Sequence, residues 1–267
     1  MDRVHYRFLP WVYTICIWIC FYISCKMIYR VKNISITMEL VKIGTSYGGW
    51  HIPLQCDINS ESIVYSAGVG EDISFDVLLS DKYDCKIHLV DPTSKSKKHF
   101  EECKEYYTTR TKFTGNIQPD YYSIIEQCKP NFNKIIYNDY GLWDKSDTLK
   151  FYKQNNEEYV SQSLIDNMFG EKYDIVNVLS LRELMLINGN NTIDMLKLDI
   201  EGAENVVLNQ MLSDNIYPKY LCVEFDLLLK GKDIDNVTKT TIERLCNNGY
   251  KIIMNDNLNI TFERTII

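Results

Sequence analysis

The sequence predicts an α/β fold built on a mostly parallel sheet whose C-terminal strand runs antiparallel. Apolar strand-like runs alternate with helical patterns through residues 62–264, and glycine turns follow the ends of several runs. Strands connected through helices pair in parallel by right-handed crossovers. The last two strand-like runs are separated only by Asn255–Leu258. Because so short a turn cannot hold a crossover helix, the final strand must be antiparallel to its neighbour.

The predicted elements follow one another in a regular order. Strands are expected at residues 62–69, 85–90, 134–138, 173–179, 193–198, 220–225, 250–254 and 259–264. Helices are expected at residues 72–79, 94–104, from 180 onward, 203–212 and 238–247. Thr93 or Ser94 is the expected N-cap of the second helix. Residues 148–152 are expected to form an added hairpin.

Composition indicates one ordinary globular domain. The chain has 267 residues, of which 45% are hydrophobic and 24% charged, so disorder is excluded. Residues 1–32 contain five basic residues and one acidic residue, which leaves a formal charge of −11 on residues 33–267. A body this acidic repels phosphate backbones, so nucleic acid is not expected as a partner. The sequence does not indicate an oligomeric state.

The N-terminal segment predicts an uncleaved, single-pass membrane anchor. Phe8–Cys25 contains no charged residue, and Lys26 can extend its side chain toward the membrane surface. A cleavable signal peptide is the alternative, but Ser24-Cys25-Lys26 is a poor cleavage site. The expected organisation is an anchor at 1–32, a stalk at 33–43 and a catalytic domain at 44–267. Basic residues flank both sides, so an endomembrane location such as the ER or Golgi, and the orientation, stay open.

Cysteine spacing does not settle the compartment. The nine cysteines include no Cys-x-x-Cys pair, which gives no support for a zinc site. Six of them are scattered outside the apolar segment, and they are either three disulfides or ordinary core residues. Cys85 and Cys222 fall within predicted strands, which favours the core for these two.

A glycine turn and an acid form the first candidate site. Gly68 and Gly70 follow the first strand, where the chain must turn sharply and let a ligand approach. Asp91 ends the second strand, 23 residues after Gly68, which is suitable for binding ribose hydroxyls. Ile73 stands where a pyrophosphate loop has its third glycine, and acids follow the turn. S-adenosylmethionine, which has no phosphate, therefore fits better than a dinucleotide. A turn without a ligand is the simpler alternative.

Carboxylates at two further strand ends form the second candidate site. Asp199 and Glu201 follow one buried strand, and Glu224 and Asp226 end the next. The carboxyl ends of parallel strands meet at one edge, where ligands of open α/β folds bind. Acids gathered there favour a raised pKa and a general base, with solvated loop acids as the alternative. Asp199 with Glu224 could instead hold a divalent cation, although no metal is expected.

Taken in order, six segments resemble the FkbM-type methyltransferase domain over about Gly44 to Asp226. They are residues 47–50 (YGGW), 65–76 (YSAGVGEDISFD), 90–93 (VDPT), 141–143 (GLW), 196–204 (LKLDIEGAE) and 223–225 (VEF). The resemblance implies a Rossmann-like methyltransferase fold, S-adenosylmethionine as methyl donor, and O-methylation of a sugar, glycan or related metabolite. It implies cofactor-binding and catalytic roles for two sets of residues. The cofactor set is Ser66, Gly68, Gly70, Asp91 and Asp199, and the catalytic set is Glu201, Asp199 and Glu224.

The chain departs from this family at three places. Relatives often have His in the segment that is here Val160–Ser163, and another His where this chain has Asp226. Ser66 replaces an acid that many methyltransferases use to bind the cofactor's ammonium group. The two missing histidines point to another base or another substrate, and Ser66 weakens the contact expected with the ammonium group. A catalytically inactive membrane protein and a nicotinamide-dependent oxidoreductase are the remaining alternatives.

Overall fold

The computed structural model describes residues 38–113, 117–154, 161–166, 168–229, 233 and 236–265, and a compact unit begins at Glu39. Within these residues no helix has both the length and the apolar character needed to cross a bilayer. The predicted anchor at Phe8–Cys25 lies outside the described residues. The anchor and the membrane location therefore stay predictions.

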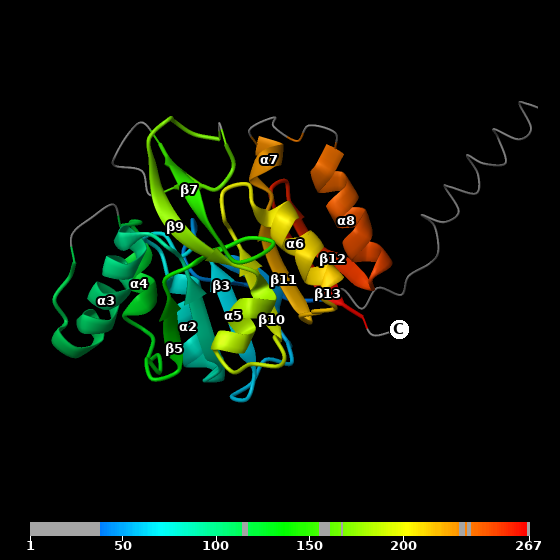
Figure 1. Ribbon diagram of the computed structural model, residues 1–267. Helices are drawn as coiled ribbons and strands as arrows, with labels where there is room; N and C mark the ends of the chain where they lie inside the picture. The colour runs from blue at the N-terminus through cyan, green and yellow to red at the C-terminus, as the bar shows by residue number, and fades with distance from the viewer. Residues whose placement is uncertain are drawn as a thin grey trace, which may run out of the picture. The chain divides into compact units, whose positions relative to one another are not determined.

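The central sheet has seven strands in the order β12-β13-β11-β10-β3-β4-β5 (Figure 1). Their bounds are β3 Ile63–Ala67, β4 Lys86–Val90, β5 Ile135–Asn138, β10 Met195–Leu198, β11 Tyr220–Glu224, β12 Tyr250–Asp256 and β13 Asn259–Arg264. Strands β5, β4, β3, β10 and β11 pair in parallel, and β13 is antiparallel to both β11 and β12. The predicted mostly parallel sheet with an antiparallel C-terminal strand is confirmed.

Helices cover both faces of this sheet (Figure 1). The first core contains side chains of α2 (Ser74–Tyr83), α3 (Ser94–Thr109) and α4 (Tyr121–Ile125). The second core contains side chains of α5 (Leu181–Ile187), α6 (Glu204–Ser213) and α8 (Val237–Asn247). Alternate residues of a strand point to opposite faces. Val64 accordingly belongs to the first core and Tyr65 to the second. Strand order changes direction between β3 and β10, which is where open α/β sheets bind ligands.

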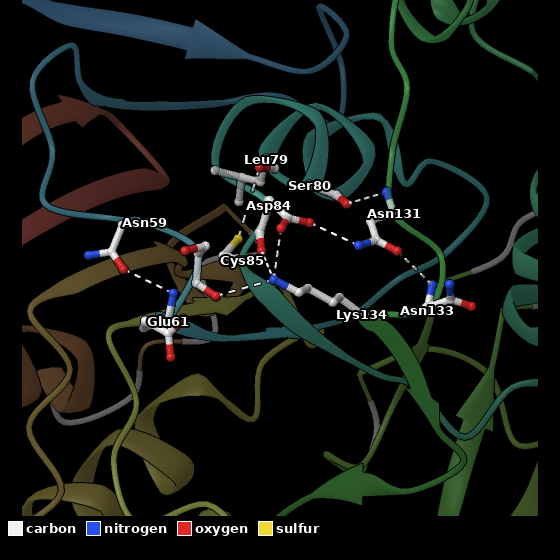
Figure 2. Close-up of polar contacts among 10 residues, drawn as sticks. Asn59, Glu61, Leu79, Ser80, Asp84, Cys85, Asn131, Asn133 and Lys134 are labelled. Carbon is white, nitrogen blue, oxygen red and sulfur yellow. Dashed lines mark hydrogen bonds and ion pairs between the residues drawn. The ribbon is translucent and has the colours of Figure 1, made fainter.

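Lys134 fixes the amino-terminal edge of the sheet, opposite the ligand-binding edge (Figure 2). Its Nζ donates to the Asp84 carbonyl at 2.7 Å and the Ser60 carbonyl at 3.3 Å, and it pairs with Asp84 Oδ2 at 2.8 Å. Asn131 Nδ2 donates to Asp84 Oδ1 at 2.9 Å. These contacts join the starts of β3, β4 and β5.

Two strand pairings were not predicted from the sequence. Strands β1 (Leu40–Ile43) and β2 (Trp50–Pro53) form an antiparallel hairpin, so Leu40–Ile43 is a strand within the segment expected to be a stalk. A second sheet has the order β6-β9-β7-β8. Its bounds are β6 Gly141–Leu142, β7 Asp147–Lys153, β8 Gln162–Ser163 and β9 Tyr173–Leu179. The expected hairpin strand is β7, and it pairs with β9 outside the central sheet.

All six described cysteines carry free thiols. Cys85 and Cys222 are fully buried in the core, as predicted. The described cysteines therefore form no disulfide.

Candidate active site

The glycine turn after β3 contains two glycines that are needed for different reasons. Gly68 has φ +78° and its N–H donates to the Val90 carbonyl at 3.0 Å. A Cβ on Gly68 would lie 1.6 Å from the carbonyl oxygen of Asp199, so any side chain there collides with the end of β10. Gly70 has φ +56°, but a Cβ there would meet no atom within 4 Å. Gly68 permits close packing, whereas Gly70 permits the left-handed turn and leaves space beside it.

Asp91 holds this glycine turn in place. Its Oδ2 accepts hydrogen bonds from the N–H groups of Val69 at 3.0 Å and Gly70 at 3.2 Å. Its Oδ1 accepts from the N–H of Thr93 at 2.8 Å and from Thr93 Oγ1 at 2.6 Å. A carboxylate has about four acceptor sites, and these contacts use four. Asp91 thus organises the loop, and ribose binding by Asp91 stays a prediction.

A cavity of about 360 Å³ opens at the carboxyl edge between β3 and β10. Its size is within the range of small-molecule sites. The structure brings five of the predicted site residues into its wall. They are Gly68, Gly70, Asp91, Asp199 and Glu201. Ser66 is fully buried beside Asp76, and Glu224 lies next to Asp199; neither belongs to the wall.

The turn after β10 fixes the orientation of Glu201. Glu201 itself has φ +56°, an uncommon conformation for a residue with a side chain. Glu204 Oε1 accepts from the N–H groups of Ile200 and Gly202, each at 3.0 Å. Ser163 Oγ donates to the Glu201 carbonyl at 2.6 Å. Contacts on both sides of Glu201 therefore stabilise a backbone conformation that is uncommon for a residue with a side chain.

Burial and mutual repulsion change the protonation of the acids behind this turn. Burial, followed by the negative charges of Asp199 and Asp226, raises the pKa of Glu224 well above its usual range. Burial, followed by the charge of Asp226, raises the pKa of Glu204 to about 8. Both side chains are therefore protonated at neutral pH. Glu224 is then suited to donate a hydrogen bond to a neighbouring group rather than to accept a proton from a substrate.

Sequence reasoning gave no role to two further residues of the wall, although both lie within motifs it identified. Tyr47 lies on the β1–β2 loop and is 73% exposed. Although the residue as a whole is exposed, desolvation of its hydroxyl, followed by the charges of Asp199 and Glu201, raises the pKa of Tyr47 to about 12. The Tyr47 hydroxyl therefore stays protonated at neutral pH and can donate a hydrogen bond at the cavity wall. Lys197 of β10 is a buried cation between Gly68 and Asp199.

The loop carrying Tyr47 is fixed to the glycine turn by polar contacts. Thr45 Oγ1 donates to Asp72 Oδ2, and the Gly48 N–H donates to Thr45 Oγ1 at 2.8 Å. A Cβ on Gly48 would lie 2.7 Å from the Asp72 carboxyl carbon. The loop thus approaches the cavity closely and places an aromatic ring at its wall.

The part of the chain that the structure describes contains no preformed metal site with three or more ligands. No group of three or more His, Cys, Asp or Glu side chains is arranged there to hold an ion.

The fold and the site together define a Rossmann-like methyltransferase fold. The evidence is a glycine turn after the first parallel strand, an acid after the second, a cavity at the topological switch point and an antiparallel last strand. The family model described as "Methyltransferase FkbM domain" matches residues 56–252. The chain therefore belongs to the FkbM methyltransferase family, and the predicted resemblance is confirmed.

Comparison with solved structures finds similarity to the fibrillarin pre-rRNA processing protein of Methanococcus jannaschii. The TM-score is 0.39 and the identity 10%, with 87% of this chain and 84% of that chain covered. No curated protein sequence matches this chain.

Proposed function

We propose that this protein is an S-adenosylmethionine-dependent methyltransferase that methylates a hydroxyl group of a sugar, glycan or related metabolite. The main support is the cavity in which the glycine turn after β3 faces Asp199 and Glu201 after β10. Membership of a methyltransferase family gives the reaction class. The acceptor class rests on the family resemblance together with the carboxylates that a weakly acidic hydroxyl requires.

The residues of the cavity fit this cofactor in charge and space. The side of Gly70 that would carry a Cβ is open, so a ligand can approach the backbone there. Glu71, Asp72 and Asp199 line the wall, and carboxylates suit the sulfonium and ammonium groups of S-adenosylmethionine. The same acids would repel a pyrophosphate, which argues against a nicotinamide dinucleotide. The bound cofactor would supply a methyl group on a positively charged sulfur.

The chain itself must orient the acceptor and remove its proton. A sugar hydroxyl is barely ionised at neutral pH, so a nearby base has to accept its proton as it attacks. Glu201 is our first candidate and Asp199 our second, because both line the cavity. Glu224, protonated behind Asp199, orients that carboxylate by hydrogen bonding. Tyr47 donates a hydrogen bond at the wall and offers a ring face to a sugar.

Titration calorimetry of the full chain with S-adenosylmethionine, S-adenosylhomocysteine and NAD tests the cofactor assignment. We expect binding of the first two and none of NAD. Incubation with methyl-labelled cofactor and a panel of glycans, glycolipids and free sugars then tests the acceptor. Preferential NAD binding would indicate an oxidoreductase. Cofactor binding without transfer to any acceptor would favour the inactive, membrane-anchored alternative.

We also propose that residues 1–32 anchor the protein in a membrane, with residues 33–38 as a linker to the catalytic domain. The support is the uncharged run Phe8–Cys25. Alkaline carbonate extraction of cell membranes tests this. An anchored protein stays in the membrane pellet, whereas release into the supernatant would contradict a membrane span.

A further inference from the structure

Lys197 is the one basic residue among the described residues that line the cavity. Its side chain is only 6% exposed. The rest of the charged wall is acidic and consists of Glu71, Asp72, Asp91, Asp199 and Glu201. Burying an ammonium group is costly unless it is paired. A lysine at this position therefore needs a structural or ligand-binding explanation.

The contacts of Lys197 place its ammonium between the two walls of the cavity. Nζ donates to the Gly68 carbonyl at 2.5 Å and lies 3.5 Å from Asp199 Oδ2. The buried carboxylate of Asp76 is close enough to be stabilised by the same charge. A lysine ammonium has three N–H donors, and the hydrogen bond to the Gly68 carbonyl and the ion pair with Asp199 engage two of them. One donor therefore remains for a ligand beside the glycine turn.

We propose that Lys197 binds the α-carboxylate of the amino-acid part of the cofactor. This inference rests on the proposed use of S-adenosylmethionine. That molecule carries two cationic groups and one anionic group, the carboxylate. In a wall with five acids the carboxylate is repelled at every charged residue except Lys197. A charge-assisted hydrogen bond to the ammonium gives the carboxylate its place next to Gly68.

A purely structural role makes a different prediction. Removing the Lys197 charge makes the cavity more negative, because Asp199 and Asp76 lose their partner. A more negative cavity strengthens binding of any cation. A ligand that needs the ammonium for its carboxylate is weakened by the same change. If Lys197 binds the carboxylate, two ligands that differ only in the carboxylate should therefore respond in opposite directions. If its role is purely structural, both should bind more tightly.

The experiment measures the dissociation constants of S-adenosylmethionine and decarboxylated S-adenosylmethionine for the full chain and for Lys197→Met by calorimetry. We expect the variant to bind S-adenosylmethionine roughly 10- to 100-fold more weakly, as for loss of a charged hydrogen bond. The decarboxylated ligand should bind equally well or more tightly. Lys134→Met is the matched control, because Lys134 also donates to a backbone carbonyl but at the opposite edge of the sheet. It should leave both constants unchanged.

Tighter binding of both ligands, as a purely structural role predicts, would overturn the role of Lys197, and so would equal weakening of both or no change in either. If Lys197→Met fails to fold, the wild-type chain still tests the idea. There the decarboxylated ligand should bind more weakly than S-adenosylmethionine, and equal or tighter binding would contradict a carboxylate site. Failure of the wild type to bind S-adenosylmethionine would overturn the proposed function and this inference together. Binding by the wild type without discrimination would overturn this inference alone.

Discussion

The carbonyl oxygen of Asp199 lies 1.6 Å from the point where a Cβ on Gly68 would stand. The turn after β3 and the end of β10 are thus in backbone contact, and the cavity opens beside this contact. Because Lys197 Nζ also donates to the Gly68 carbonyl, the two strand ends behave as one unit. The position of Asp199 in the site therefore depends on the absence of a side chain at Gly68.

Gly68→Ala and Gly70→Ala should differ sharply in stability. At Gly68 the new Cβ overlaps backbone, which cannot move without separating β3 from β10, so we expect a loss of at least about 4 kcal/mol. At Gly70 the space is open, and only the positive φ is penalised, by about 1–2 kcal/mol. Urea unfolding of both variants measures the difference. Equal losses would show that the contact with Asp199 is not what requires glycine.

Asp91→Asn should destabilise the glycine turn before it affects any ligand directly. An amide has one acceptor oxygen, so its NH₂ group would face N–H donors that now bind the carboxylate. We expect roughly 2–3 kcal/mol lower stability by urea unfolding, with weaker cofactor binding as a consequence. Asp139→Asn is the control, because Asp139 forms an exposed ion pair with Lys97. Unchanged stability with weakened binding would favour direct ribose contact by Asp91.

The sequence predicted the central sheet well because its signals are local. Strand β10, buried throughout, is followed at once by two acids and a glycine, and the short turn after β12 requires an antiparallel strand. The second sheet was harder to predict. Strand β9 is exposed from Tyr173 to Ile175 and buried only at its end, so its partners are set by long-range pairing with β7.

The site was predictable in position but not in detail. Strand ends identify which acids reach the carboxyl edge, so Asp199 and Glu201 could be placed there from the sequence. Spacing cannot show that the Asp91 carboxylate accepts four hydrogen bonds from its own chain, nor that Lys197 points to the cavity. Both features depend on side-chain direction, which a pattern of residues does not specify.

Glu201→Gln should reduce methyl transfer while cofactor binding persists. The amide is the same size but cannot accept the hydroxyl proton, so turnover should fall at least about 100-fold. The dissociation constant of S-adenosylmethionine should change by less than about threefold. Glu71→Gln removes another carboxylate from the same wall and should have a much smaller effect on turnover. Normal turnover in Glu201→Gln would shift the role of base to Asp199.

Glu204→Gln should change how stability depends on pH. The unfolded side chain has a pKa near 4.5 and the folded one about 8, chiefly because of burial. Between these values the folded state binds more protons than the unfolded state, so the free energy of unfolding falls as pH rises. One group contributes a slope of at most about 1.4 kcal/mol per pH unit. Glutamine keeps an oxygen for the N–H groups of Ile200 and Gly202 but does not titrate.

The variant should therefore match the wild type near pH 5 and become progressively more stable than it toward pH 9. Urea unfolding at a series of pH values measures this difference. Glu243→Gln, at an exposed position of α8, should give a curve parallel to that of the wild type. If the Glu204→Gln curve is also parallel, Glu204 is ionised throughout. The N–H groups of the Glu201 turn would then donate to a charged Glu204 carboxylate. The negative charge of Asp226 would repel that buried carboxylate.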